Sequence, residues 1–264
     1  MNIQLFSERC SGSNFLESVF NANLNGIHFT YEFGFKHWLE DAFVNTKTFP
    51  DNVPFIVLIR SPYNWIRSIY RTPWHAAHHL KDLPFSEFIR SEWYCVWDEQ
   101  TGISKNSQLW MRPMDFETNR LKGNQRFKNV IEARRVKYEM WDSRLSSLPL
   151  YFKTSYEEFS HSPDDLLVRF TKAVDLPAPT EIKIPRGYKG NLSWKSRLLL
   201  ILSGGRIGGF KQKPKEPISL EDIDYLHEQF DADQETFWGY DLNKLSAAER
   251  DYTLSSAKEL SSAP

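Results

Sequence analysis

The hydrophobic positions of the chain follow two periods, which predict alternating strands and helices. Nearly continuous apolar runs predict buried strands over residues 3–6, 53–61 and 148–155. Apolar residues at helical spacing predict helices directly after Gly12 and over residues 64–70, 130–148 and 163–174. Strands and helices that alternate in this order predict an α/β fold, in which a parallel sheet is flanked by helices.

The size and composition of the chain indicate one large domain. Its 264 residues are 41% hydrophobic and 15% aromatic, which is enough to bury a substantial core. We expect a single domain over residues 1–245 and a polar, dispensable C-terminal tail over residues 246–264. Residues 74–128 are irregular, aromatic and polar, as expected of a region shaped around a ligand.

The distribution of apolar residues also indicates the cellular compartment of the protein. No apolar run approaches the roughly 18 residues of a membrane span, and Glu8 and Arg9 stand where a signal peptide needs apolar residues. The two cysteines are too few for a disulfide framework. We therefore expect a cytoplasmic protein without a membrane span.

A turn of small residues joins the first predicted strand to the first predicted helix, and its sequence over residues 10–16 is CSGSNFL. Backbone amides in such a turn, together with the positive end of the following helix, bind phosphate or sulfate. The Walker A pattern is absent, because Gly12 is followed by Ser13 and Asn14 and not by Lys. The turn therefore predicts an anion site and disfavours an ordinary nucleotide triphosphatase.

Two further polar pairs follow apolar stretches. Arg60 ends the second long strand and Ser68 lies eight residues later, in the next predicted helix. Together they can close on one anion, although an Arg at a strand end is often an ordinary surface residue. Lys36 and His37 follow a short apolar stretch. This pair can stabilise a leaving group and accept a proton, although an isolated Lys-His is often a solvated turn.

Together these segments resemble the sulfotransferase superfamily, whose members use 3′-phosphoadenosine 5′-phosphosulfate as donor. CSGSNFL resembles the family's phosphosulfate loop, and RSP at residues 60–62, with Ser68 at the family's spacing, resembles its 3′-phosphate motif. YEEFSHSPDDLLVRF, residues 156–170, is similar to a segment whose Tyr lies near the adenine. RGYKGNLSWK, residues 186–195, resembles the stretch that covers the nucleotide.

The resemblance covers roughly residues 3–240 and implies a P-loop-like sulfotransferase fold. It places Lys36 and His37 in catalysis, as the family's Lys and His stand about two dozen residues before the Arg of the 3′-phosphate motif. The implied donor contacts come from Cys10, Ser11, Gly12, Ser13, Asn14, Arg60, Ser68, Tyr156, Arg186, Lys189 and Gly190.

Two positions depart from the family pattern. Cys10 stands where the family has a cation, and we expect Arg9, one residue earlier, to supply that charge to the donor. Lys36 and His37 are adjacent, whereas one residue separates the family's Lys and His, so Glu32 and Glu40 compete with His37 as the base.

The implied reaction moves a sulfuryl group to a hydroxyl or amine of a carbohydrate or small molecule. Cationic side chains and backbone donors can stabilise the shifting charge, so we expect no metal. We interpret His75, His78 and His79 as an acceptor-facing or solvated patch, because they lack Cys or carboxylate partners at metal-ligand spacing.

We expect no nucleic-acid partner. Two alternatives stay open, a P-loop-type kinase and a non-catalytic nucleotide-binding protein on the same fold.

Overall fold

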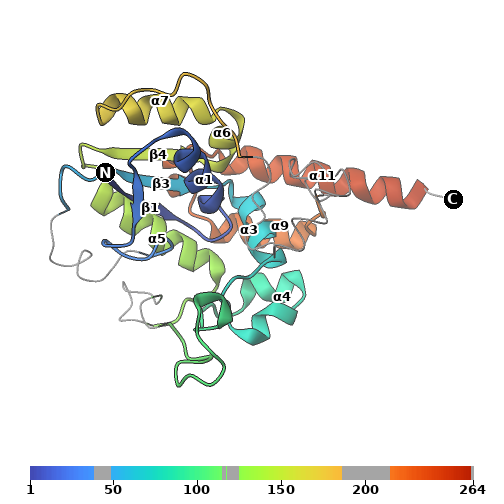
Figure 1. Ribbon diagram of the computed structural model, residues 1–264. Helices are drawn as coiled ribbons and strands as arrows, with labels where there is room; N and C mark the ends of the chain where they lie inside the picture. The colour runs from blue at the N-terminus through green and yellow to red at the C-terminus, as the bar shows by residue number, and fades with distance from the viewer. Residues whose placement is uncertain (39–48, 115–116, 118–124, 186–214, 263–264) are drawn as a thin grey trace, which may run out of the picture.

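A four-stranded parallel sheet with the strand order β2-β1-β3-β4 forms the centre of the protein (Figure 1). The computed structural model describes residues 1–38, 49–114, 117, 125–185 and 215–262. The predicted α/β fold with a parallel sheet is confirmed, and all three predicted strands are present. The strands are β1 (Asn2–Ser7), β2 (His28–Thr30), β3 (Phe55–Ile59) and β4 (Tyr151–Ser155).

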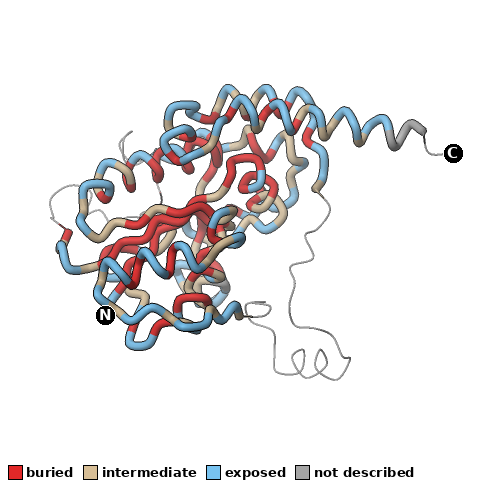
Figure 2. The backbone as a smooth tube through the Cα atoms, turned by 90° about the horizontal axis from the view of Figure 1, so that it is seen from above, coloured by how far each residue is buried: buried red, intermediate tan, exposed pale blue. Residues whose placement is uncertain are grey.

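Helices cover both faces of this sheet. Ile56 and Leu58 of β3 pack in one core with α1 (Ser13–Asn23), α6 (Tyr156–His161) and α7 (Pro163–Ala173). Phe55, Val57 and Ile59 enter a second core with α3 (Pro62–Arg71) and α5 (Val130–Leu145). Because β3 is buried on both faces, its sequence is continuously apolar. Figure 2 shows the strands as the buried centre of the molecule.

The predicted helices are confirmed, and polar caps explain where several of them begin. Asn129 caps α5 by accepting a hydrogen bond from the Glu132 amide at 2.8 Å. Ser155 and Glu158 form a capping box that starts α6 directly after β4. Further elements are η1 (His78–Asp82), α4 (Phe85–Arg90), η2 (Glu99–Thr101), α9 (Leu220–Gln229), α10 (Ala232–Phe237) and α11 (Leu242–Ser262).

The predicted boundary between residues 245 and 246 falls inside α11, which corrects the expectation of a dispensable tail. Ser246 and Glu249 are buried, because the first half of α11 packs against α9. The Ser246 hydroxyl forms a hydrogen bond with that of Tyr63 at 2.5 Å, and Glu249 pairs with Arg67. Only the far end of α11 extends away from the body (Figures 1 and 2).

The strand order places the carboxyl ends of β1 and β3 side by side. The chain leaves β1 toward β2 on one side and then crosses to β3 on the other, so a topological switch point lies between β1 and β3. Open α/β sheets bind ligands at such a point. The turn at residues 8–12 follows β1, and Arg60 follows β3.

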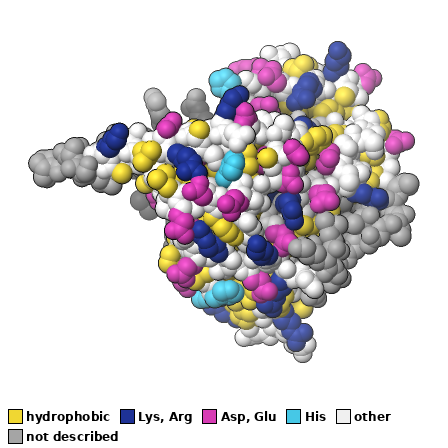
Figure 3. Space-filling model, turned by 180° about the vertical axis from the view of Figure 1, so that it is seen from behind, with side chains coloured by type: hydrophobic (Ala, Val, Ile, Leu, Met, Phe, Trp, Pro, Cys, Tyr) yellow, Lys and Arg dark blue, Asp and Glu magenta, His cyan; other side chains and the backbone are white. Residues whose placement is uncertain are grey.

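The surface charges and the character of the helices were compared with the predicted location and partners of the protein. Acidic and basic side chains alternate over the face seen in Figure 3, with no large area of one sign among the described side chains drawn there. Among the described residues, no helix has the length and apolar character needed to cross a membrane.

Candidate functional site

The turn between β1 and α1 has the backbone shape of an anion site. Cys10 and Gly12 both have left-handed backbone angles, with φ of 63° and 93°. Gly12 is the N-cap of α1, and no side chain caps this end of the helix. The amides of Ser13 and Asn14 have no hydrogen-bond partner among the described residues, and at a helix start such amides point out of the helix end, where an anion would be stabilised.

Arg60 and Tyr156 close around this turn from the ends of β3 and β4. Arg60 Nη1 donates a hydrogen bond to the Cys10 carbonyl at 2.8 Å, and its guanidinium lies 4.6 Å from the centre of the Tyr156 ring. A Cβ atom added to Gly12 would overlap that ring. The structure thus brings together three segments that are far apart in the sequence and that sequence analysis assigned to one nucleotide.

Ser68 lies within hydrogen-bond reach of the Cys10 thiol at this turn. Burial raises the pKa of the Cys10 thiol to about 12, against the opposing effects of Arg60 and of a hydrogen bond with Ser68. The Cys10 thiol lies 3.5 Å from the Thr72 carbonyl, to which it donates. Cys10 is therefore neutral near pH 7 and contributes no charge to the turn.

Arg9 does not supply the missing cation, which corrects the sequence-based expectation. Its side chain is 1% exposed and its guanidinium forms a double hydrogen bond with Glu117, with Nη2 at 2.7 Å from Oε2. Lys137 Nζ lies 2.6 Å from Glu117 and 3.1 Å from Glu8. Although burial opposes ionisation, Arg9 and Lys137 hold the pKa of Glu117 well below its ordinary value. Arg9 is thus one member of a buried, charge-balanced quartet.

Lys36 is a second cation, besides Arg60, that the fold brings to the turn. Its Nζ lies 2.5 Å from Asn14 Oδ1 and 3.2 Å from Glu17 Oε1, both on the first turns of α1. The Ser7 amide donates to the Lys36 carbonyl at 2.8 Å, which ties this segment to the end of β1. Lys36 therefore lies beside the first turns of α1, and its catalytic role stays a prediction.

His37 is held as a neutral imidazole. Its Nδ1 lies 2.8 Å from the Ser7 carbonyl, which can only accept, so Nδ1 carries the proton and Nε2 the lone pair. Burial lowers the pKa of His37 well below its ordinary value, and Arg9, Lys36 and Lys137 lower it further against the effect of the Ser7 carbonyl. Its role as the catalytic base stays a prediction.

The other predicted site residues are distributed as follows. Ser11 and Ser13 are buried in the turn, and Asn14 is exposed. The Ser11 hydroxyl has no hydrogen-bond partner among the described residues. Glu32 is exposed. Outside the described residues lie Glu40, Arg186, Lys189 and Gly190.

Sequence analysis missed the roles of Glu8, Glu117 and Lys137 in the buried quartet. One signal was available, because Lys137 stands four residues after Ala133 and four before Trp141 on the apolar face of α5. A charged residue at such a position needs a buried partner. Glu117 has no such signal, since it lies in no helix or strand.

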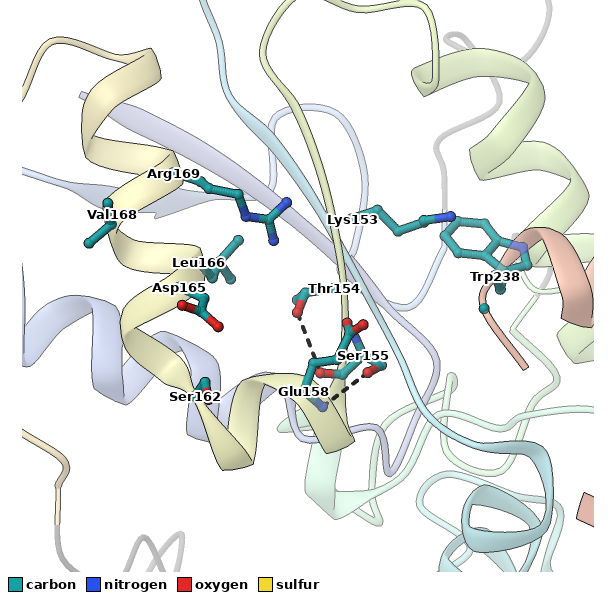
Figure 4. Close-up of a pocket in the computed structure, with 11 residues that line it drawn as sticks. Lys153, Thr154, Ser155, Glu158, Ser162, Asp165, Leu166, Val168, Arg169 and Trp238 are labelled. Carbon is teal, nitrogen blue, oxygen red and sulfur yellow. Dashed lines mark hydrogen bonds between the residues drawn. The ribbon is translucent and has the colours of Figure 1, made fainter. Parts of the chain in front are cut away.

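A separate cavity of about 750 Å³ lies at the outer edge of β4 (Figure 4). Its walls are Lys153–Ser155 from β4, residues of α6 and α7, and Trp238 with Gly239. None of the predicted site residues lines it. Neither this cavity nor any other described part of the chain gathers three His, Cys, Asp or Glu side chains that can hold a metal ion.

Comparison with known proteins does not identify a family. The chain matches no family model and no curated protein.

Proposed function

We propose that this protein is a sulfotransferase with a P-loop-like fold, which moves a sulfuryl group from 3′-phosphoadenosine 5′-phosphosulfate to a hydroxyl or amine. The acceptor is a carbohydrate or another small molecule. One observation carries the proposal: Arg60, Ser68 and Tyr156 converge on the anion-binding turn at the switch point of the sheet. A bisphosphorylated nucleotide needs hydrogen-bond donors for two anionic groups and a flat surface for its base. The turn and these three side chains offer both kinds of contact around one loop.

The residues of the turn fit the 5′-phosphosulfate. The free amides at the start of α1 suit its oxygens, and the buried Ser11 hydroxyl offers another donor without a competing partner in the described chain. Gly12 leaves room for the Tyr156 ring, which no larger residue at that position would. The turn therefore combines anion donors with an aromatic surface.

Arg60 and Ser68 fit the 3′-phosphate. Arg60 uses Nη1 to hold the Cys10 carbonyl, while its buried Nε has no partner in the described chain. A guanidinium has five N–H donors, so enough remain for a charge-assisted contact with a phosphate. The plane of the guanidinium over Tyr156 also provides a stacking surface for the adenine.

Lys36 supplies charge to the reaction. When bound, the donor supplies an activated sulfuryl group and a bisphosphate leaving group. Lys36, beside Asn14, stabilises negative charge that accumulates on the leaving oxygen, and the amides of the turn hold the group in line for attack. The acceptor's proton needs a base within reach of the same point.

The neutral Cys10 and the paired Arg9 favour one second candidate, a protein that binds the nucleotide without catalysis. A P-loop-type kinase is the weaker alternative, since no Lys follows Gly12.

Transfer of labelled sulfate from the donor to a library of carbohydrates, amines and phenols tests the proposal. Transfer to a library member supports it. Nucleotide binding without transfer favours the second candidate, and ATP turnover with magnesium favours the kinase.

A further inference from the structure

His75 and Asp98 form a hydrogen-bonded pair that the proposed donor site does not use. His75 Nδ1 lies 2.8 Å from Asp98 Oδ1, and the two side chains are 12% and 7% exposed. At neutral pH the carboxylate only accepts, so Nδ1 carries the proton and Nε2 carries a lone pair. No hydrogen bond engages Nε2 within the described residues. An imidazole oriented by a carboxylate in this way is the arrangement of a general base.

The segment that leads to this pair contacts the anion-binding turn. The Cys10 thiol contacts the carbonyl of Thr72, three residues before His75. The charges of Arg9, the residue before Cys10, and of Glu117 both act on His75. His75 has a left-handed φ of 61° and its carbonyl accepts a hydrogen bond from the Val96 amide at 2.8 Å. A non-glycine residue held in this conformation is common at functional sites.

The surroundings of the two imidazoles differ in charge. His37 faces three cations, Arg9, Lys36 and Lys137, and its Nδ1 partner is a neutral carbonyl. His75 contacts the carboxylate of Asp98 and has Glu117 nearby, against the charge of Arg9. Lys81 reaches Asp98 Oδ2 only at 4.0 Å. Burial and the charge of Arg9 lower the pKa of His75 as well, but Asp98 and Glu117 oppose that shift, so an imidazolium is less disfavoured at His75 than at His37.

We propose that His75, oriented by Asp98, accepts the acceptor's proton during sulfuryl transfer, and that His37 stays neutral and orients the acceptor. This inference rests on the proposed function. The acceptor oxygen forms a bond to sulfur while its proton passes to His75 Nε2. The bond between sulfur and the bridging oxygen breaks, and its electron pair leaves with the bisphosphate. His75 then releases the proton to solvent.

The test compares histidine variants in the full-length protein. The probe is labelled donor, with release of sulfate to water and transfer to unsubstituted phenol both measured. We expect His75→Gln to lower the rate by about 10²- to 10⁴-fold and His37→Gln by less than about tenfold. His28→Gln, at an exposed position at the start of β2, serves as the control and should leave the rate unchanged. The affinity for 3′,5′-adenosine bisphosphate should stay within about threefold in all of them.

Asp98→Asn separates a positioning role from a purely structural one. Loss of the carboxylate removes the charge that stabilises the imidazolium, so the pKa of His75 falls. The base works only when unprotonated, so the acidic limb of the rate profile should move to lower pH while the plateau rate decreases. A structural defect alone would lower the plateau and leave the limb where it is.

Three results would each overturn a different part of the proposal. Wild-type turnover that survives His75→Gln within about threefold overturns the assignment of His75 but leaves the sulfotransferase proposal intact. An unshifted acidic limb in Asp98→Asn overturns the role of Asp98. Wild-type protein that transfers no sulfate to any acceptor overturns the proposed function, and this inference with it. Thermal unfolding of each variant identifies any that fails to fold, in which case His75→Asn replaces His75→Gln.

Discussion

The ring of Tyr156 lies directly against the Cα atom of Gly12, so the first residue of α6 covers the N-cap of α1. The contact joins the ends of β1 and β4, which are not neighbours in the sheet. Arg60, at the end of β3 between them, lies over the same ring, 4.6 Å from its centre. This relationship sets the shape of the proposed nucleotide site.

Gly12→Ala should both strain the turn and displace Tyr156. Gly12 has a φ of 93°, and its new Cβ would overlap the ring. We expect a loss of about 1–3 kcal/mol in the free energy of unfolding and weaker nucleotide binding. Gly26→Ala is the matched control, since Gly26 also has a positive φ but open space around its Cα. Urea unfolding and calorimetry give the comparison, and an equal cost in both variants would contradict the contact.

Arg60→Ala should remove the preference for a 3′-phosphate. The wild-type protein is expected to bind 3′,5′-adenosine bisphosphate more tightly than 5′-AMP, because each charge-assisted hydrogen bond contributes about 1.5–3 kcal/mol. Arg112→Ala, at an exposed position, should leave that preference intact. Calorimetry measures both nucleotides on the three proteins. Equal wild-type affinity for the two nucleotides would contradict the assignment of Arg60.

Lys36→Met should slow transfer and weaken donor binding modestly. The side chain lies at Asn14, where it contributes charge to the leaving oxygen and to the bound anion. Glu17→Gln should act in the opposite direction on binding, because it removes the carboxylate that partly neutralises Lys36. Rates and affinities for labelled donor check both variants. If Glu17→Gln weakened donor binding as strongly as Lys36→Met, the charge argument would fail.

Glu117→Gln should destabilise the fold strongly. It leaves the buried cations Arg9 and Lys137 facing Glu8 alone, a change that costs about 3–5 kcal/mol. Glu92→Gln, which breaks the exposed pair with Arg126, should cost less than about 1 kcal/mol. Urea unfolding at pH 7 makes this comparison.

The same carboxylate predicts a pH dependence. The pKa of Glu117 is depressed in the folded state, so its stabilisation is complete above the unfolded value of about 4.3. It is lost as the pH falls below that value toward the lower folded pKa. Wild-type stability should therefore fall more steeply than that of Glu117→Gln between about pH 5 and pH 3, measured by urea unfolding. Parallel curves would contradict an ionised Glu117.

Truncation within α11 tests where the domain ends. A chain that stops at residue 245 loses the buried Ser246 and Glu249, which leaves the Arg67 guanidinium without its carboxylate. We expect a clear drop in the unfolding temperature or insoluble protein. A chain that stops at residue 254 keeps both contacts and should unfold close to the full-length temperature. Equal stability of the two truncations would show that α11 is dispensable after all.

The local elements of the fold were predictable because they follow from short-range patterns. The apolar run of β3, the spacing of apolar residues in α5 and α7, and the small-residue turn before α1 each lie within about one element of sequence. The proximity of Arg60 to the turn also followed from them, since the carboxyl ends of parallel strands share one edge of a sheet. The amphipathic first half of α11 was missed because its buried positions include Ser246 and Glu249, which composition marks as polar.

What only the tertiary structure decided is which charges neutralise one another. Arg9 pairs with Glu117, 108 residues later, and His75 pairs with Asp98, 23 residues later. Neither pairing has a sequence period, because the partners meet through the packing of separate elements. Burial then decides their role: a desolvated charge must be compensated, so Arg9 becomes part of the core while Lys36 remains at the turn. The sequence by itself determined three of the four strands, the helices that follow them and the edge of the sheet where the proposed site lies, and the fold determined which ionisable residues remain available there.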